Sequence, residues 1–307
     1  MTVSMGTVRV GTRGSALALV QARTVIAALE AVFPALSCEE CIISTRGDRL
    51  TDQPFAAIGS RGIFAREIEA ALLAGRIDLA VHSLKDLESE IPAGLMIGAV
   101  PARADARDAL AAAEGFTLAT LPAGARVATS SVRRTALLRH LRPDLQIEPI
   151  RGNVPTRLDK ARSHGLDGVI LAAAGLDRLG LAATIAERLN PDSFLPEAGQ
   201  GALAVEVRTA DRVTRDLVSA IDEPRSAACC AAERSCARRL EGSCRTPIAA
   251  YAQWDGPALR LRALVCSTDG RHMLQAEQRG AANTPAALGL AVAEQLLAAG
   301  AAELLVV

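Results

Sequence analysis

A short apolar run followed by a polar turn and a stretch of helical periodicity recurs along this chain, and this repetition constrains the fold more than any other feature. The first unit begins at Thr7–Val10, continues through a Gly-containing turn, and shows apolar residues at helical spacing from Ser15 to Val32. Further apolar runs that precede a polar turn lie at 77–82, 126–129, 147–150 and 168–171. Alternating strands and helices predict an α/β fold with largely parallel sheets that helices cover.

The pattern changes after Pro224. A helix is predicted over Ser226–Leu240, and three strand-like runs follow it near 248–254, 258–266 and 271–279. Asp-Gly turns separate these runs, and turns so closely spaced predict antiparallel hairpins. We therefore expect the last part of the chain to form a small α+β domain.

Charge and composition exclude several classes of protein. The 307 residues include 34 basic and 34 acidic side chains, so the zero net charge argues against a general attraction to nucleic acid or to an anionic membrane. No uninterrupted run of about 18 apolar residues suggests a membrane span, and the first residues lack the apolar stretch of a signal peptide. We expect a cytoplasmic protein that binds neither nucleic acid nor membrane.

The seven cysteines predict neither a disulfide framework nor a metal site. Their number is odd and their spacing is irregular, which is atypical of a disulfide-stabilised domain. Cys38 and Cys41 form one C-x-x-C pair, but no second pair and no nearby histidine completes a set of metal ligands. We expect free thiols and no protein-bound metal.

Arginines follow the predicted strands on the side where an open α/β sheet binds its ligands. The planar guanidinium suits carboxylates and phosphates, and helix N-termini in the same loops add partial positive charge. Six arginines share this placement: Arg13, Arg133, Arg134, Arg151, Arg157 and Arg178. Any one of them is explained as well by the surface of an arginine-rich chain, but the six together predict a polyanionic ligand.

Only two lysines occur in the chain, and one of them, Lys85, lies beside Asp86 at the end of a predicted strand. A surface ion pair is one interpretation of this dipeptide. The other is an aspartate kept ionised by cationic neighbours, which holds an N–H group of a substrate and stabilises a developing cation.

Cys244 follows a Gly-Ser pair in a loop region that also contains Arg238, Arg239 and Arg245. Cationic surroundings lower the pKa of a thiol and favour the nucleophilic thiolate. The spacing leaves both a reactive cysteine and an ordinary one open.

Seven motifs follow one another along the chain: GTRGSALA at 11–18, TRGD at 45–48, AVHSLKD at 80–86, TSSVRR at 129–134, RGNVPTRL at 151–158, LPEAGQGA at 195–202 and LEGSCRTPI at 240–248. In these motifs the chain resembles the porphobilinogen deaminases, also called hydroxymethylbilane synthases, over nearly its whole length. Seven motifs in this order are far more specific than any single Gly-rich loop.

The resemblance implies a fold and a reaction. The implied fold has two α/β lobes with mixed sheets, like type II periplasmic binding proteins, and a third small α+β domain with an antiparallel three-stranded sheet. Domain 1 would comprise 1–102 and 201–220, domain 2 would comprise 103–200, and domain 3 would comprise 221–307. The implied reaction joins four porphobilinogen molecules, each losing ammonia, into the linear tetrapyrrole hydroxymethylbilane. The implied cofactor is a dipyrromethane held by a thioether to Cys244, and we expect a monomer.

The same resemblance implies roles for individual residues. Asp86 matches the family's catalytic aspartate. Binding of cofactor or substrate is implied for Arg13, Ser15, Arg61, Ser83, Lys85, Thr129, Ser130, Ser131, Arg133, Arg134, Arg151, Gly152, Arg157, Arg178 and Gln200. Two positions depart from the family's pattern: Arg61 stands where a lysine is usual, and Glu88 stands where a proline is common. Arg61 keeps the positive charge, whereas Glu88 adds a carboxylate that would repel the carboxylates of the substrate.

A non-catalytic module that binds organic anions is the main alternative, because two α/β lobes with arginines in a cleft would also capture an organic acid. This alternative gives Cys244 no role. An enzyme that acts on phosphates is a second alternative, but the chain has no G-x-x-x-x-G-K-[ST] loop.

Overall fold

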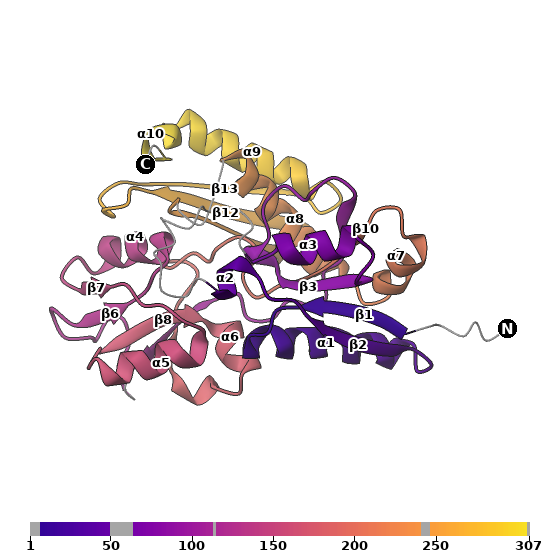
Figure 1. The fold of residues 1–307 in the computed structure, drawn as a ribbon. Coiled ribbons are helices and arrows are strands. Elements are labelled where there is room, and N and C mark those ends of the chain that lie inside the picture. The colour runs from indigo at the N-terminus through magenta and orange to yellow at the C-terminus, as the bar shows by residue number, and fades with distance from the viewer. Residues whose placement is uncertain (1–6, 50–63, 113–114, 241–245, 306–307) are drawn as a thin grey trace. The chain divides into compact units, whose positions relative to one another are not determined.

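The computed structural model describes residues 7–49, 64–112, 115–240 and 246–305 (Figure 1). The chain forms two compact units, of which the first comprises 1–104 and 202–227 and the second comprises 105–201 and 228–307. No helix in the described part of the chain combines the length and the apolarity needed to cross a membrane. The predicted division into three domains stays a prediction.

A five-stranded mixed sheet forms the centre of the first unit. Its strands are β1 (Thr7–Thr12), β2 (Ser37–Ile42), β3 (Leu79–Ser83), β4 (Leu95–Ala99) and β10 (Leu203–Arg208), in the order β2-β1-β3-β10-β4. β1 pairs in parallel with β2 and β3, whereas β10 runs antiparallel to both β3 and β4. The first unit also contains the helices α1 (Ala16–Val32), α2 (Arg46–Arg49), α3 (Arg66–Leu73), η1 (Leu84–Asp86) and α7 (Arg212–Ser219).

Helix α1 shows how local sequence sets these elements. Its N-cap, Ser15, accepts a hydrogen bond from the backbone N–H of Ala18 at 3.3 Å, which satisfies one of the unpaired N–H groups of a helix start. Ala22, Val25 and Leu29 recur at helical spacing and are buried against the sheet in one cluster with Leu79 and Val205 of the strands. The other face of the sheet packs on α3, as Figure 1 also shows.

The second unit contains a sheet with the same strand order. Its strands are β5 (Asp108–Ala112), β6 (Arg126–Ala128), β7 (Gln146–Glu148), β8 (Gly168–Ala172) and β9 (Ile185–Arg188), in the order β7-β6-β8-β5-β9. The helices that follow its strands are α4 (Val132–Leu141), α5 (Val154–Ser163), α6 (Ala173–Arg178) and η2 (Ala182–Thr184). β5 is antiparallel to β8 and β9, so it occupies the position that β10 has in the first unit. In each sheet the antiparallel strand is the first strand after the chain has crossed from the other unit.

A three-stranded antiparallel sheet completes the second unit, as the closely spaced turns predicted. It consists of β11 (Ile248–Asp255), β12 (Ala258–Cys266) and β13 (Met273–Ala281), and the accompanying helices are α8 (Pro224–Arg239), α9 (Pro285–Ala298) and α10 (Ala301–Leu305). Helix α9 passes close to α8 at Gly289, where a Cβ atom would lie 2.3 Å from the carbonyl oxygen of Ala232. The predicted fold class, with two mixed α/β sheets and one small antiparallel sheet, is confirmed.

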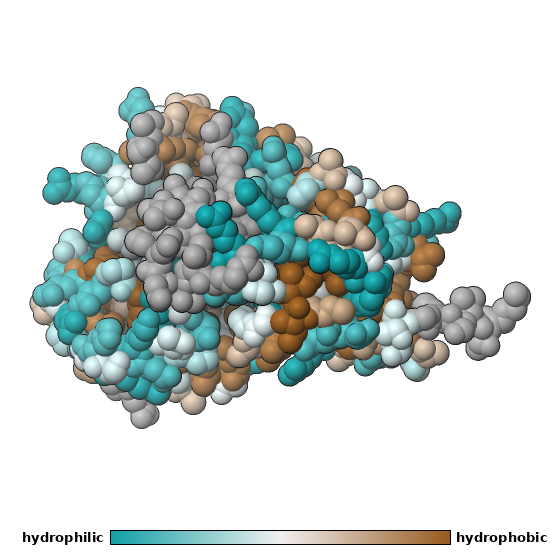
Figure 2. Space-filling model, viewed as in Figure 1, coloured by the Kyte–Doolittle hydropathy of each residue, from teal (hydrophilic) through white to brown (hydrophobic). Residues whose placement is uncertain are grey.

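Polar side chains dominate the face of the molecule drawn in Figure 2, with apolar residues between them in small groups. The large apolar side chains that are exposed in the described part of the chain come from different elements: Val32, Ile42, Leu73, Phe116, Leu141, Val213 and Leu290.

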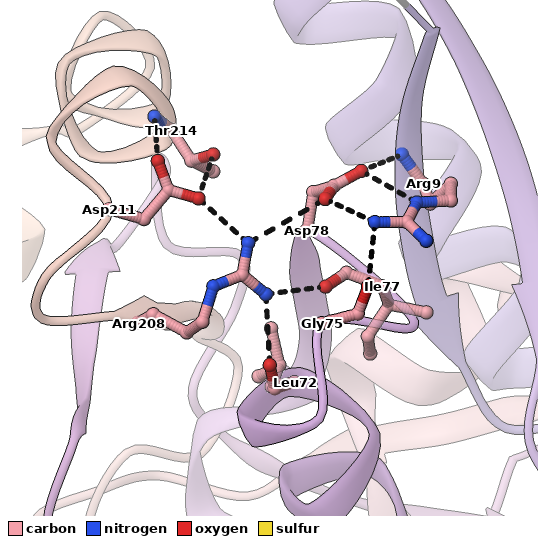
Figure 3. A network of polar contacts seen from close by, with 8 residues as sticks. All are labelled: Arg9, Leu72, Gly75, Ile77, Asp78, Arg208, Asp211 and Thr214. Atoms are coloured by element: carbon pink, nitrogen blue, oxygen red, sulfur yellow. Dashed lines mark hydrogen bonds and ion pairs between the residues drawn. The ribbon is translucent and has the colours of Figure 1, made fainter.

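A polar network ties the returning strand β10 into the first unit (Figure 3). The carboxylate of Asp78 accepts hydrogen bonds from the backbone and the guanidinium of Arg9 at 2.8–3.0 Å. Arg208 donates to the carbonyl of Ile77 at 2.7 Å and to Asp211 at 2.7 Å, and Asp211 caps helix α7 by accepting from Thr214. Burial by itself raises the pKa of Asp78, but hydrogen bonds from Arg9 and the charges of Arg9 and Arg208 outweigh it and hold that pKa below its usual value.

We predict that Asp78→Asn lowers the free energy of unfolding by about 1–2 kcal/mol, because it removes the charge from several hydrogen bonds to Arg9. The lowered pKa adds a pH dependence: the stabilisation is present above pH ~4 and is lost as the pH falls through the folded-state pKa. Urea unfolding at neutral and acidic pH measures both effects. Asp216→Asn is the control, because the ion pair of Asp216 with Arg212 has side chains that are 73% and 89% exposed. An equal loss in the two variants would contradict the prediction.

Candidate active site

A pocket in the first unit lies where two neighbouring parallel strands end. β1 ends one residue before Arg13, and β3 ends at Ser83, after which η1 carries Lys85 and Asp86. The pocket is lined by Arg13, Ala18, Gln21, Phe64, Ala65, Val81, His82, Ser83 and Asp86. Strand ends that are adjacent in the sheet therefore bring three of the predicted site residues, Arg13, Ser83 and Asp86, to one place.

Arg13 is held by an acidic partner that the sequence did not identify. Its guanidinium donates to Asp48 from Nε at 3.1 Å and from Nη2 at 2.5 Å, and its carbon lies 4.0 Å from the centre of the Phe64 ring. Thr45 also donates its hydroxyl to Asp48 at 2.7 Å. Burial alone raises the pKa of Asp48, but the hydrogen bonds and charge of Arg13, with those from Thr45, outweigh it and lower that pKa. Arg13 thus enters the pocket as a fixed guanidinium whose charge Asp48 partly balances.

Gln21 lines the pocket and was not identified from the sequence. Its side chain donates a hydrogen bond to the hydroxyl of Ser83 at 2.8 Å, although Gln21 lies on the buried face of α1. A polar residue on an otherwise apolar helix face was the available signal.

Asp86 is exposed at the end of η1, and Lys85 is partly exposed. The segment is anchored at its start, where the N–H of Leu84 donates to the carbonyl of Ala202 at 3.0 Å. Glu88, the unusual carboxylate near Asp86, lies 4.0 Å from the guanidinium of Arg66, and the Arg66 side chain is 68% exposed.

Two adjacent arginines in the second unit share one buried carboxylate. Arg134 donates to Asp108 from Nε at 2.8 Å, and Arg133 lies 2.8 Å from the other oxygen of Asp108. Arg133 also donates to the carbonyl of Leu195 at 2.8 Å, and Arg134 donates to the side chain of Gln200 at 3.3 Å. Because two guanidinium groups face one carboxylate, this buried group keeps an excess of positive charge.

The loops after β6 and β7 use their polar side chains to fix one another. The hydroxyl of Ser130 donates to the carbonyl of Ile150 at 2.5 Å and accepts from its N–H at 3.0 Å, which joins the two strand ends. Ser131 caps helix α4 by accepting from the N–H of Arg134, and the hydroxyl of Thr129 accepts from the N–H of Ser131 at 3.2 Å.

Arg151 and Gly152 begin the next loop. Gly152 has a φ of +116°, and a Cβ there would lie 2.6 Å from Thr156, so only glycine fits without strain. Its carbonyl accepts from the guanidinium of Arg157 at 2.8 Å, and Arg151 is partly exposed.

Arg178 and Gln200 reach the segments where the chain enters and leaves the second unit. Arg178 donates to the carbonyl of Gly201 at 2.8 Å, and burial lowers its pKa. Gln200 is fully buried and donates to the carbonyl of Ala106 at 2.7 Å. Two predicted site residues, Arg61 and Cys244, lie outside the described residues.

Comparisons with known proteins agree with these motifs. The family model described as "Porphobilinogen deaminase, dipyromethane cofactor binding domain" matches residues 8–216, and "Porphobilinogen deaminase, C-terminal domain" matches residues 227–298. A porphobilinogen deaminase of Moorella thermoacetica is 49% identical over 298 residues, which are 97% of this chain and 95% of that protein. One of Roseiflexus castenholzii is 49% identical over 96% of this chain and 97% of its own length.

Two binding proteins are among the solved structures similar to this chain. The methionine binding protein MetQ matches with a TM-score of 0.43 and 12% identity over 69% of this chain and 88% of its own. The probable amino-acid transporter binding protein ytmK of Bacillus subtilis matches with a TM-score of 0.41 and 12% identity over 70% of this chain and 89% of its own.

We predict that Asp108→Asn destabilises the protein by about 3–5 kcal/mol, because it leaves two buried guanidinium groups without their counter-charge. Urea unfolding of the full chain measures this loss. Asp159→Asn is the matched control in the same unit, since the ion pair of Asp159 with Arg162 spans 3.8 Å between side chains that are 75% and 71% exposed. A loss below about 1 kcal/mol for Asp108→Asn would mean that the arginines do not depend on this carboxylate.

Proposed function

This chain belongs to the porphobilinogen deaminase family, and from that membership we propose that it joins four porphobilinogen molecules head to tail, with release of ammonia, into hydroxymethylbilane. It is a transferase of tetrapyrrole biosynthesis. The observation that carries this function is the match to both family models, which together span most of the chain, with one relative 49% identical over 97% of its length. The solute-binding alternative is not favoured.

The second unit offers groups that fit the family's dipyrromethane cofactor, whose pyrrole rings carry acetate and propionate side chains. Within the described part of the chain, Nε and Nη2 of Arg133 are buried and have no hydrogen-bond partner. Such donors suit the carboxylates of the cofactor, because guanidinium groups bind carboxylates with charge-assisted hydrogen bonds. We assign cofactor binding to the loops after β6 and β7, namely to Thr129, Ser130, Ser131, Arg133, Arg134, Arg151, Gly152 and Arg157.

When bound, the dipyrromethane supplies the covalently held pyrrole end to which the incoming rings are joined. We assign its attachment to Cys244, which follows the Gly-Ser pair of the LEGSCRTPI motif. A thioether at this position keeps the growing chain on the protein between condensations. Arg61, Arg178 and Gln200 are assigned to substrate handling on the same family resemblance.

Asp86 is proposed as the catalytic carboxylate. It is exposed at the pocket of the first unit, next to Lys85 and in the same pocket as Arg13. Loss of ammonia from porphobilinogen leaves an electron-poor ring, and an ionised carboxylate beside the pyrrole N–H stabilises that developing cation. Arg13, Ser15, Ser83 and Lys85 are assigned to binding the carboxylates of the substrate.

We also propose a monomeric protein of the cytoplasm. The assignment rests on the small separate groups of exposed apolar side chains and on thiols such as Cys38, Cys41, Cys236 and Cys266, which are typical of a reducing compartment.

We predict that intact mass spectrometry of the purified protein shows the added mass of two pyrrole units, and that Cys244→Ser lacks it. Cys38→Ser is the matched control, because Cys38 is a partly exposed thiol outside the cofactor loop. An active parent protein with an unmodified mass would rule out the covalent anchor. A binding module for organic acids predicts no added mass in any of the three proteins.

We predict that Asp86→Asn reduces the rate of porphobilinogen turnover about a hundredfold or more, because a preorganised charge that stabilises the transition state typically contributes about 2.7–4 kcal/mol. Ammonia release by protein that carries the cofactor mass measures this rate. Glu90→Gln, which removes an exposed carboxylate four residues further along, keeps the parent rate. If Asp86→Asn folds, carries the cofactor and turns over at the parent rate, the role of Asp86 is wrong.

A further inference from the structure

Three buried ionisable side chains form a group in the first unit, and one of them, His82, lines the pocket described above. His82 and Glu206 are on the neighbouring strands β3 and β10, and the antiparallel register pairs Glu206 with Ala80, two residues before His82. Both side chains therefore project from the same face of the sheet, where Nε2 of His82 lies 3.1 Å from a carboxylate oxygen of Glu206. Helix α3 packs on this face and contributes the third side chain, Glu69.

The burial of these groups is nearly complete. The side chains of His82 and Glu206 are 5% and 0% exposed, and Glu69 is 7% exposed. The direction of this hydrogen bond depends on the tautomer of the imidazole ring. Within the described residues, the second oxygen of Glu206 is buried and has no hydrogen-bond partner.

One imidazole cannot balance two buried carboxylates. Burial is the main cause that raises the pKa of Glu69, to about 7, and repulsion from Glu206 and Glu88 raises it further, while His82 and Arg66 lower it. The cluster therefore gains a negative charge within the range of pH in which cytoplasmic enzymes work.

This change of charge takes place beside the reactive groups. His82 lines the pocket together with Arg13 and Asp86, and it directly precedes Ser83. Glu88, two residues after Asp86, is one of the charges that act on Glu69. The sequence motifs assigned no role to Glu69, His82 or Glu206, although His82 lies within the AVHSLKD motif.

We propose that Glu69, together with the His82–Glu206 pair, is a positioning group whose negative charge favours the cationic chemical step in the Asp86 pocket. This inference rests on the proposed function and deepens it. Ammonia leaves from the protonated aminomethyl group, so the positive charge moves from that group onto the pyrrole ring beside Asp86 as the C–N bond breaks. A negative charge next to this pocket stabilises the charge on the ring, and therefore the transition state, more than the bound substrate, which raises kcat. The substrate's carboxylates are present throughout, so the same charge weakens substrate binding and raises KM.

Other charges face this cluster from the elements around it. Arg66 and Glu67 belong to α3, and Glu88 follows η1. Asp78 directly precedes β3 and Arg208 ends β10, so both lie at the end of these strands that is farther from Ser83. Asp78 and Arg208 are paired with Arg9 and Asp211, and Glu67 accepts from the N–H of Arg46, so Arg66 and Glu88 are the surface charges suited to testing the cluster.

The test compares kcat and KM of the cofactor-loaded parent and Glu69→Gln between about pH 5.5 and 8.5 with porphobilinogen as substrate. In the parent we expect both kcat and KM to rise as the pH increases through about 7. Each should rise roughly three- to tenfold, which is the effect expected of one additional unit charge that acts through a partly screened medium. In Glu69→Gln both rises disappear and both constants stay near the parent's acidic values. If the parent's rises persist in Glu69→Gln, the proposal is overturned.

Two variants of charged residues near the surface test in which direction the inflection of kcat and KM moves, and they leave the buried group unaltered. They also allow the proposal to be tested if Glu69→Gln does not fold. Glu88→Gln removes a charge that raises the pKa of Glu69, so the inflection moves to lower pH. Arg66→Gln removes a charge that lowers this pKa, so the inflection moves to higher pH. Shifts of the same sign, or no shift in either variant, overturn the proposal.

A measurement of stability needs no turnover, so it distinguishes a failure of this proposal from a failure of the proposed function. Because the folded-state pKa of Glu69 is raised, its contribution to stability is complete below pH ~4.5 and is lost as the pH rises to about 7. Thermal unfolding of the parent shows this loss, and Glu69→Gln lacks it. A parent protein that carries the loss but releases no ammonia from porphobilinogen refutes the proposed function, whereas a parent that turns over with flat kcat and KM refutes only the positioning role.

Discussion

The antiparallel strand at the interior of each five-stranded sheet is the constraint on which the rest of the structure depends. β10 enters the first sheet between β3 and β4, and β5 enters the second between β8 and β9, each directly after the chain crosses between units. Pairing of β10 with β3 anchors the segment that carries Asp86, since Leu84 bonds to Ala202. β5 begins with Asp108, the carboxylate that holds Arg133 and Arg134. The antiparallel strands β10 and β5 thus position proposed site residues in both units.

Carboxylates of the protein fix the orientation of three arginines that we assign to binding. Asp48 orients Arg13 and Asp108 orients two arginines, so these guanidinium groups are fixed before any ligand arrives. Preorganised groups lose less conformational entropy on binding than mobile side chains. The pairing at Asp108 is unequal, with two cations for one anion, and this excess of positive charge suits the carboxylates of the proposed cofactor.

Glu88 acts on the buried group of Glu69, His82 and Glu206. In the sequence it is a carboxylate two residues after Asp86, and in the structure it lies 4.0 Å from Arg66 and acts on the ionisation of Glu69. Charged groups therefore lie at two levels around the pocket: those that line it, and the buried group that we propose to act on its chemistry.

The sequence by itself determined the local elements and the order of the motifs. Strand runs, helix periodicity and the N-caps Ser15 and Ser131 follow from contacts between residues a few positions apart, and the family resemblance assigned Asp86 and Cys244. Only the tertiary structure decided which side chains pair with one another around the pocket. Arg13 with Asp48, Gln21 with Ser83 and His82 with Glu206 are 35, 62 and 124 residues apart. Such pairs depend on strand order and register, which local periodicity does not encode because the same alternation fits any neighbour in a sheet.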